Sequence, residues 1–376
     1  MSTATSITAK VAVVFGGPSP EHDVSILTGL QAARELVRDG RETTGLYWSK
    51  TGAFHRVVPT LEALDFLEGV PRGAEELRLA AGPEGGFVAV SSRLGRSRPL
   101  AIDVVVNCCH GGPGEDGSLQ GAFDLAGVSY TGPSMAGAAL GMDKLAFAGV
   151  VAAAGLPALP RVLLEPETRE TGFAGPYIVK PRFGGSSIGV EVVEDIATAT
   201  ARLAANPHLR NGAVLEPYRP DLFDLNVAVR TWPELSLSAI ERPLRSEESS
   251  EILGYADKYV GGEGMASAPR ELPATLAAPV EKAIAELARD LTARCALRGI
   301  TRIDFLSDGE ALFVNEINTV PGSLARYLWV DPAVSFIELL DAMIEEAAGR
   351  PTAHRSTVGA DGSVLRSAGG IAAKLG

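Results

Sequence analysis

Short apolar runs alternate with glycine-rich turns in the first third of the chain. Residues 10–15 form an apolar run that ends in Gly-Gly-Pro, and we predict a buried strand followed by a turn. Residues 24–37 carry apolar side chains at helical spacing and end before a glycine, which predicts a helix. Further strands are predicted at 45–48 and 101–108. This order indicates a parallel α/β domain, whose ligands bind at the carboxyl ends of the strands.

The rest of the chain continues this mixed pattern. An alanine-rich helical stretch is predicted over 134–154, and a helix with an apolar stripe over 272–297. Strands are predicted at 161–164, 177–180, 188–193, 214–217, 225–231, 301–306 and 311–318. Residues 50–100 are weakly patterned, and no structure is predicted for residues 351–376.

Length and charge narrow the class of protein. A chain of 376 residues indicates two or three domains. We place the boundaries near residues 132 and 215, which gives segments 1–132, 133–215 and 216–376. The net charge of −12 argues against nucleic-acid and anionic-membrane partners. An anionic substrate would therefore need a local basic pocket.

The cysteines and the first residues indicate a cellular compartment. Cys108, Cys109 and Cys295 lack zinc-ligand spacing, so we expect buried thiols in a reducing environment. The chain shows neither a signal peptide nor an apolar stretch of about 18 residues, the length that would indicate a membrane helix. We therefore expect a cytoplasmic protein.

The strongest chemical signal lies in the last two predicted strands. Because side chains alternate along a strand, Arg302 and Asp304 share one face. Glu316 and Asn318 share a face of the following strand by the same rule. An aspartate, a glutamate and an asparagine on one face form an oxygen-ligand site that suits Mg²⁺ bridging nucleotide phosphates. The alternative is a polar strand face in contact with solvent.

The turn between these strands decides whether both pairs lie on the same face. A two-residue turn at 308–309 would place them on opposite faces. A three-residue loop at 307–309, with glycine in the left-handed conformation, pairs Asp304 with Leu312 and places all four side chains together. We predict the three-residue loop.

A lysine followed by a flexible loop indicates a second binding site. Lys180 ends a predicted strand, and residues 184–187 then supply glycine backbone and serine hydroxyl donors that suit phosphates. The lysine precedes the glycines, so this segment is not the P-loop that begins with glycines and ends in Gly-Lys. An ordinary hairpin turn is the alternative interpretation.

Two loops at the ends of the first and third strands carry acids and a histidine. The loop 16–25 lacks the dinucleotide fingerprint, and Glu21 and Asp23 occupy the place of a pyrophosphate. These acids suit a substrate ammonium, or they complement the helix dipole. His110 opens the other glycine-rich loop and is a candidate carboxylate or acid–base group, although histidine is often structural.

Seven segments together resemble the D-alanine–D-alanine ligase family of the ATP-grasp superfamily. In chain order they are FGGPSPEHDVS, HGGPGEDGSLQG, YTGPSMAGAALGMDK, KPRFGGSSIGV, ADKY, RIDF and NEINTVPG. The resemblance extends from Val11 to about Trp329. It implies an α/β and α+β chain with an ATP-grasp fold behind an N-terminal parallel α/β domain. ATP would lie between the second and third domains.

The resemblance also assigns the nucleotide and metal ligands. Lys144 and Lys180 would bind the phosphates, with Lys258 nearby. Glu216 would take the adenine amino group, and Asp224 stands where the family usually has a ribose-binding glutamate. Asp304, Glu316 and Asn318 would hold two Mg²⁺ ions, with Mn²⁺ as a substitute.

The same resemblance implies the reaction. Glu21 and His110 would bind the ammonium and carboxylate of the first amino acid, and Ser186 and Tyr259 would join Glu21 in a hydrogen-bonded set. Arg302 and the backbone at Gly322 would stabilise the oxyanion. The implied activity is ATP-dependent joining of two D-alanines through an acylphosphate, for peptidoglycan precursors. Loop 184–187 and segment 243–262 are lid candidates, and a homodimer is expected.

The second substrate is where the chain departs from the family. The family typically has a serine five residues beyond Gly322, which helps to hold the second carboxylate, and this chain has Tyr327 followed by Leu328. Arg326 is the candidate for a charged carboxylate clamp. A related ligase of secondary metabolism with a different second substrate is the alternative. Tyr259 matches the peptide-forming members, so an amine nucleophile is favoured.

Overall fold

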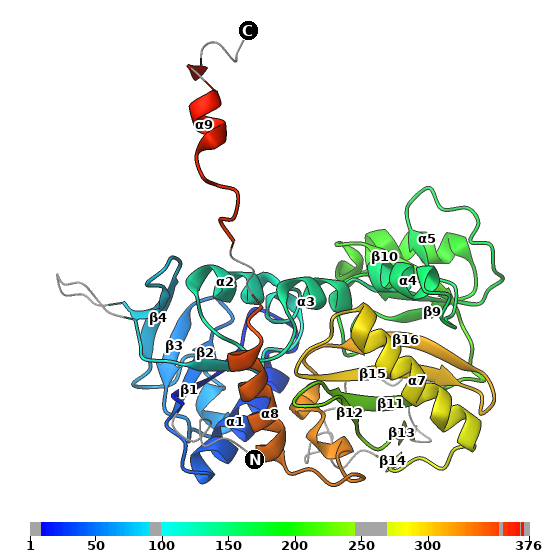
Figure 1. Ribbon diagram of the computed structural model, residues 1–376. Helices are drawn as coiled ribbons and strands as arrows, with labels where there is room; N and C mark the ends of the chain where they lie inside the picture. Colours follow the sequence, from blue (N-terminus) through cyan, green and yellow to red (C-terminus); the bar gives the residue numbers. More distant parts are fainter. Residues whose placement is uncertain (1–8, 91–98, 245–268, 353–355, 369, 372–376) are drawn as a thin grey trace.

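Three sheets of four or six strands organise the described part of the chain. The computed structural model describes residues 9–90, 99–244, 269–352, 356–368 and 370–371. Figure 1 shows the N-terminal sheet on the left, a large sheet at the lower right and a small sheet above it. Their strands follow one another along the sequence, so each sheet is built from one continuous part of the chain.

The N-terminal sheet has the order β5-β4-β3-β2-β1-β6. Its strands are β1 (Val11–Gly16), β2 (Thr43–Trp48), β3 (Phe54–Val57), β4 (Glu75–Ala80), β5 (Gly86–Ala89) and β6 (Val104–Asn107). The predicted parallel pairing holds for β1 with β2 and β6, but β2 to β5 pair in antiparallel fashion. The prediction missed β3, β4 and β5, since these short strands show little apolar alternation.

Helix α1 covers this sheet and begins at the loop that carries Glu21. The helices of this part are α1 (His22–Arg38), η1 (Ala63–Phe66), η2 (Gly112–Gly114) and α2 (Ser118–Ala126). The apolar spacing correctly predicted α1, whose Leu30, Ala33 and Leu36 are buried. Gly29 lies so close to the Phe15 side chain that a Cβ atom there would be 2.4 Å from it. The glycine therefore lets α1 approach β1 closely.

The small sheet has the order β7-β10-β8-β9 and is entirely antiparallel. Its elements are β7 (Val162–Leu164), β8 (Tyr177–Pro181), β9 (Glu191–Val193), α5 (Ile196–Ala205), η3 (Pro207–Leu209) and β10 (Ala213–Pro217). The helix predicted at 134–154 is two helices, α3 (Met135–Met142) and α4 (Lys144–Ala153). Asp143 separates them, because its carboxylate accepts the N–H groups of Leu145 and Ala146 and caps α4.

The large sheet has the order β12-β11-β15-β16. Its elements are β11 (Phe223–Arg230), β12 (Ser236–Leu237), α7 (Ala278–Arg294), β15 (Ile300–Ser307) and β16 (Leu312–Asn318), and β13 (Arg242–Pro243) pairs separately with β14 (Arg270–Glu271). Helix α7 is shorter than predicted and places Val280, Ile284 and Leu291 in the core beneath this sheet. The apolar stripe was therefore correct, although the helix boundaries were too wide.

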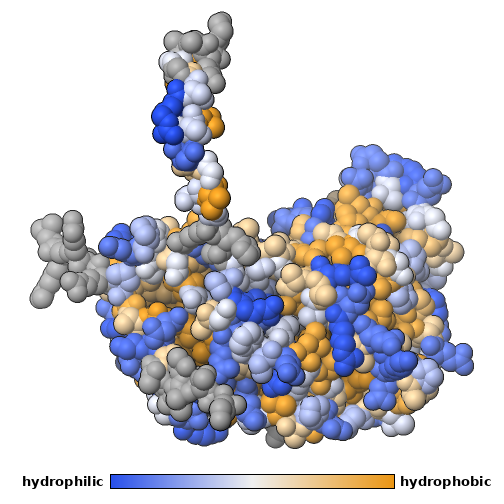
Figure 2. Space-filling model, viewed as in Figure 1, coloured by the Kyte–Doolittle hydropathy of each residue, from blue (hydrophilic) through white to orange (hydrophobic). Residues whose placement is uncertain are grey.

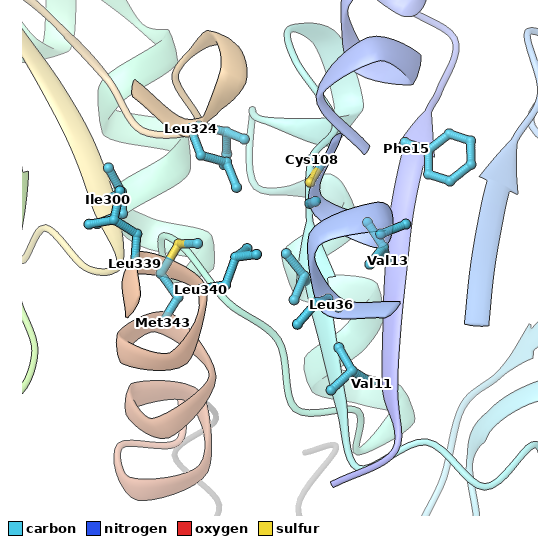
Figure 3. Packing of buried hydrophobic residues seen from close by; sticks show 14 of the residues in the cluster. Val11, Val13, Phe15, Leu36, Cys108, Ile300, Leu324, Leu339, Leu340 and Met343 are labelled. Atoms are coloured by element: carbon cyan, nitrogen blue, oxygen red, sulfur yellow. The ribbon is translucent and has the colours of Figure 1, made fainter. Parts of the chain in front are cut away.

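The last part of the chain returns to the N-terminal sheet. The short helix η5 (Gly322–Leu328) leads to α8 (Phe336–Gly349). Figure 3 shows Leu339, Leu340 and Met343 of α8 in one cluster with Val11 and Val13 of β1. This core joins the beginning and the end of the chain, a contact that sequence patterning did not predict. It anchors the segment that enters the cavity described below.

The surface is of mixed polarity, and a short helix near the C-terminus stands apart from the sheets. Hydrophilic and hydrophobic side chains are mixed over the face in Figure 2. Helix α9 (Ser363–Ser367) stands apart from the sheets in Figure 1, in a region where no structure was predicted. Among the described helices, none combines the length and the apolar character needed to cross a membrane. The three cysteines are buried free thiols, as predicted.

Candidate active site

One cavity of about 440 Å³ gathers side chains from all three sheets. The sequence-predicted residues that line it are Glu21, His110, Lys144, Lys180, Ser186, Glu216, Asp224, Arg302, Asp304, Glu316, Asn318 and Gly322. Lys258 and Tyr259 lie outside the described residues. Residues that are as much as 300 positions apart in the sequence thus meet in one place.

The β15–β16 hairpin supplies four of these side chains from a single face. Asp304 lies opposite Glu316, and Arg302 lies opposite Asn318. The predicted register was wrong, because Ser307 pairs with Leu312 and the loop is longer than three residues. The prediction of a common face was nevertheless correct.

A β-bulge is the reason that the common face survives the different loop. Ser307, Leu306 and Phe305 pair with Leu312, Phe313 and Val314. If this register continued, Asp304 would lie opposite Asn315, and Glu316 would point to the other face of the hairpin. The register shifts between Asp304 and Phe305, so Asn315 becomes the extra residue. The bulge thereby brings Glu316 to the face of Asp304.

Charge pairs hold this face in place. Both Nε and a terminal nitrogen of Arg302 donate to the Asp304 carboxylate at 2.7 Å, and Asn318 Nδ2 donates to the same group at 2.9 Å. Burial opposes the charge on Arg302, but the Asp304 carboxylate raises the pKa of the guanidinium above its usual value. Arg302 is therefore a fixed cation in the lining of the cavity, to which Gly322 also contributes.

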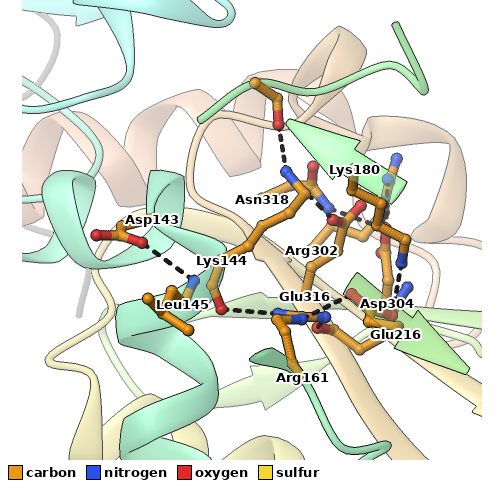
Figure 4. A network of polar contacts seen from close by, with 12 residues as sticks. Asp143, Lys144, Leu145, Arg161, Lys180, Glu216, Arg302, Asp304, Glu316 and Asn318 are labelled. Atoms are coloured by element: carbon orange, nitrogen blue, oxygen red, sulfur yellow. Dashed lines mark hydrogen bonds and ion pairs between the residues drawn. The ribbon is translucent and has the colours of Figure 1, made fainter. Parts of the chain in front are cut away.

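Another part of the cavity lining is a buried carboxylate between two cations (Figure 4). Glu216 accepts from Lys180 Nζ at 2.9 Å and from Arg161 Nε at 2.6 Å. Burial disfavours its charge, but the two cations lower the pKa of Glu216 to about 2. The Lys144 ammonium lies 3.9 Å from Glu316 and donates to the Gly184 carbonyl, and burial lowers its pKa. Sequence analysis missed Arg161, which belongs to none of the motifs.

The Gly/Ser loop reaches across the cavity to the N-terminal sheet. Ser186 Oγ donates to Glu21 Oε1, which joins the small-sheet part of the chain to the loop before α1. Ser186 and Ser187 adopt left-handed backbone conformations, with φ values of 51° and 58°. The loop thus lines one side of the cavity, and its lid role stays a prediction. Residues 245–262 of the other lid candidate lie outside the described residues.

His110 connects the N-terminal sheet to the segment that carries Gly322. Its Nδ1 donates to the Val320 carbonyl at 2.7 Å, so its Nε2 accepts from the Thr28 hydroxyl, also at 2.7 Å. Thr28 Oγ1 in turn accepts the Ser323 N–H at 3.1 Å. Burial lowers the pKa of His110, which favours the neutral ring. In this structure His110 orients a loop, and its predicted role toward a carboxylate stays a prediction.

Two family models match successive parts of the chain. The family models described as D-ala D-ala ligase N-terminus and D-ala D-ala ligase C-terminus match residues 10–133 and 139–345. The chain belongs to the D-alanine–D-alanine ligase family. The mixed α/β, ATP-grasp fold expected from the motifs is confirmed by these models and by solved structures.

Relatives from this family match the chain over almost their full length. D-alanine--D-alanine ligases of Methylobacterium sp. (strain 4-46) and Mycobacterium tuberculosis (strain ATCC 25618 / H37Rv) are 33% and 32% identical, each over 91% of this chain and over 92% and 96% of their own lengths. The structure of the Coxiella burnetii D-alanine-D-alanine ligase has a TM-score of 0.75 at 23% identity, covering 92% of this chain and 95% of that chain. VanG D-Ala:D-Ser ligase from Enterococcus faecalis has a TM-score of 0.72 at 23% identity, covering 90% and 99%.

The residues beyond Gly322 do not all reach the cavity. Ser323, Leu324 and Ala325 form a left-handed turn, each with φ near 50°. After this turn, Leu328 is buried in the hydrophobic core, and the exposed Arg326 places its guanidinium 5.5 Å from the Phe336 ring centre. Neither side chain belongs to the cavity lining in the described part of the chain. This placement does not support a substrate contact for either residue.

Tyr327 lies next to the cavity rather than in its lining. Its ring centre is 4.8 Å from the Arg270 guanidinium, and Arg270 does line the cavity. Burial raises the pKa of the Tyr327 phenol, and the neighbouring Arg302 opposes that shift. The phenol therefore stays protonated beside the two guanidinium groups.

The donor set fits a magnesium site. Asp304, Glu316 and Asn318 present carboxylate and amide oxygens from one face of the β15–β16 hairpin. Such oxygens are the ligands that Mg²⁺ prefers. Asn318 uses its amide nitrogen toward Asp304, so its amide oxygen remains as the ligand atom. The ammonium of Lys144, 3.9 Å from Glu316, places a cation beside these oxygen ligands.

Glu115 is a further buried acid that sequence analysis did not single out. Its carboxylate accepts the N–H groups of Gly111 and Val320 and the Thr319 hydroxyl. Burial, and then the nearby charge of Glu21, raise its pKa from 4.5 to about 7. Glu115 therefore ties the His110 loop to the Gly322 segment at some electrostatic cost.

This raised pKa predicts a pH dependence of stability. Between pH 4.5 and about 7 the folded chain binds more protons at Glu115 than the unfolded chain, so the free energy of unfolding falls as the pH rises. Glu115→Gln removes this contribution. The quantity to follow is the thermal midpoint of the parent minus the thermal midpoint of Glu115→Gln. We expect this difference to decrease as the pH is raised from 5 to 7 and to be constant above that. A difference independent of pH would contradict the assignment.

Proposed function

We propose that this chain joins two D-alanine molecules into D-alanyl-D-alanine, with ATP converted to ADP and phosphate, for peptidoglycan precursors. One observation carries the proposal. The β15–β16 face with its oxygen ligands and Arg302 lines one cavity together with Lys180 and with Lys144, whose ammonium lies 3.9 Å from Glu316. Family membership supports the same peptide-bond-forming activity.

The first step activates a carboxylate. A carboxylate is a poor electrophile, and its phosphorylation by ATP gives an acylphosphate with a good leaving group. Lys144 and Lys180, which line the cavity, would bind the phosphates and balance their charge, and Glu216 would accept from the adenine amino group. Mg²⁺ would supply further charge neutralisation. Asp304, Glu316 and Asn318 would bind it.

The second step forms the peptide bond. The amine of the second amino acid attacks the acyl carbon, the carbonyl oxygen becomes an oxyanion, and phosphate then leaves. Arg302 and the Gly322 N–H, whose residues both line the cavity, would stabilise that oxyanion. Glu21 offers a carboxylate to the first ammonium, and the Ser186 loop covers the site and excludes water.

Compartment and assembly belong to the same proposal. ATP and amino acids are cytoplasmic substrates, so we place the enzyme in the cytoplasm. We also expect a homodimer, since exposed large apolar side chains gather in one stretch of the N-terminal part, at Val58, Leu64, Leu67 and Val70. Sedimentation velocity measures the assembly directly.

Tyr327 favours a second candidate function. The phenol takes the family's serine position and lies beside Arg270 and Arg302, so it changes the space for the second amino acid. A ligase that joins a different second amino acid, in secondary metabolism, is therefore the alternative. Its chemistry and its first substrate would be the same.

One product assay tests both candidates. The protein is incubated with ATP, Mg²⁺ and pairs drawn from a panel of D- and L-amino acids, and the products are identified by mass spectrometry. We expect ADP, phosphate and D-alanyl-D-alanine from D-alanine alone. A mixed dipeptide formed in preference would establish the alternative, and the absence of ADP with every pair would overturn both.

A further inference from the structure

Arg161 is a buried cation to which the proposed chemistry gives no role. It immediately precedes β7, and its side chain is 6% exposed. Its nitrogens donate to Glu216 Oε1 on β10 at 2.6 Å, to the Lys144 carbonyl at 2.8 Å and to the Asn315 carbonyl of β16 at 3.2 Å. Figure 4 shows the guanidinium between Lys144 and Glu216. One side chain therefore bonds strands of two sheets and the first residue of helix α4.

Each of the three acceptors controls a different part of the cavity. Glu216 faces the proposed base site, and Lys144 is the first residue of α4, whose ammonium reaches toward Glu316. Asn315 is the extra residue of the β-bulge, and the bulge sets the face on which Glu316 stands. The planar guanidinium holds its donors in a fixed arrangement, so these bonds fix the acceptors relative to one another.

We propose that Arg161 is a positioning residue that couples the nucleotide end of the cavity to its metal-binding face. This inference rests on the proposed ATP site. Through the Asn315 carbonyl it holds the bulge that presents Glu316, and through Glu216 and the start of α4 it holds the groups toward ADP or ATP. Loss of the guanidinium leaves Glu216 with Lys180 as its remaining cation and removes a donor from the Lys144 and Asn315 carbonyls, so both ends are affected.

The protein is titrated with ADP in a calorimeter, first in the presence of EDTA and then in the presence of Mg²⁺. The two titrations separate effects on the nucleotide end of the cavity from effects on its metal-binding face. The parent is expected to bind Mg·ADP more tightly than ADP alone, and the ratio of the two affinities is the metal gain. Arg161→Met is expected to weaken metal-free ADP binding about tenfold, as hydrogen bonds to a charged group are lost. It is also expected to reduce the metal gain about tenfold, the lower end of the effect of removing groups that orient metal ligands.

Arg161→Lys supplies the discriminating variant and keeps the test valid if Arg161→Met does not fold. The ammonium keeps the charge beside Glu216 but lacks the planar fork. We expect it to restore metal-free ADP binding while the metal gain stays low. A role confined to stability would change the thermal midpoint and leave that gain at the parental value.

Arg202→Met is the matched control. Arg202 pairs with Glu191 at 2.9 Å in the same part of the chain, but its side chain is 46% exposed and lies outside the cavity lining. It is expected to leave both affinities unchanged. A parental metal gain in both Arg161 variants would overturn this inference alone. A parent that binds no ADP under either condition would overturn the proposed nucleotide site as well.

Discussion

Replacing Arg302 with alanine is expected to lower the turnover number by about 10²–10³-fold, while the affinity for ADP changes little. The guanidinium is held by Asp304 through two bonds of 2.7 Å and lines the same cavity as Gly322. Such a fixed donor contributes most where negative charge develops in the transition state. Steady-state kinetics measure the turnover number, and calorimetry measures the affinity.

Two variants make this prediction specific. Arg302→Lys keeps the charge without the two-pronged contact to Asp304, so we expect partial recovery of turnover. Arg294→Ala removes an exposed arginine that pairs with Asp290 on α7, and parental kinetics are expected. Parental turnover in Arg302→Ala would reject the oxyanion role. A loss of ADP affinity as large as the loss of turnover would show that Arg302 acts in nucleotide binding instead.

Glu316→Gln is expected to raise the Mg²⁺ concentration for half-maximal activity by about 10–100-fold or more, since even groups behind metal ligands have effects of that size. Glu316 stands opposite Asp304 on the ligand face and 3.9 Å from the Lys144 ammonium. The amide keeps the shape and removes the charge that a divalent cation requires. Activity is measured across a Mg²⁺ series, and Mn²⁺ binding in the presence of ADP is followed by electron paramagnetic resonance.

Glu310→Gln is the control in the same hairpin. Glu310 lies in the exposed loop between β15 and β16, outside the cavity lining. Its Mg²⁺ dependence is expected to match that of the parent. If Glu316→Gln binds Mn²⁺ as tightly as the parent does, the assignment of Glu316 as a metal ligand is wrong.

The active-site hairpin shows how far local patterns reach. Alternation placed Arg302 with Asp304, and Glu316 with Asn318, from the sequence alone. The common face was also predicted, but through a wrong register, because a β-bulge at Asn315 restores a parity that the longer loop would have lost. A bulge depends on the partner strand and on contacts from other elements, which a single strand pattern does not contain.

Residues that act through tertiary contacts were the ones missed. Arg161 and Glu115 belong to no spacing rule, and their roles follow from acceptors far away in the sequence. Arg326 was favoured as a carboxylate clamp on charge alone, but a left-handed turn at 323–325 directs it to the surface. Turn handedness at non-glycine residues is set by the surrounding packing, so composition does not reveal it.

The transfer of oxygen from substrate to phosphate tests the account most directly. D-alanine labelled with ¹⁸O in its carboxylate is incubated with ATP, Mg²⁺ and the protein, and the phosphate released is examined by mass spectrometry or ³¹P resonance. Acylphosphate formation predicts that each phosphate released with a dipeptide carries one labelled oxygen from the carboxylate. Unlabelled phosphate, or AMP and pyrophosphate in place of ADP and phosphate, would contradict the mechanism derived from this cavity.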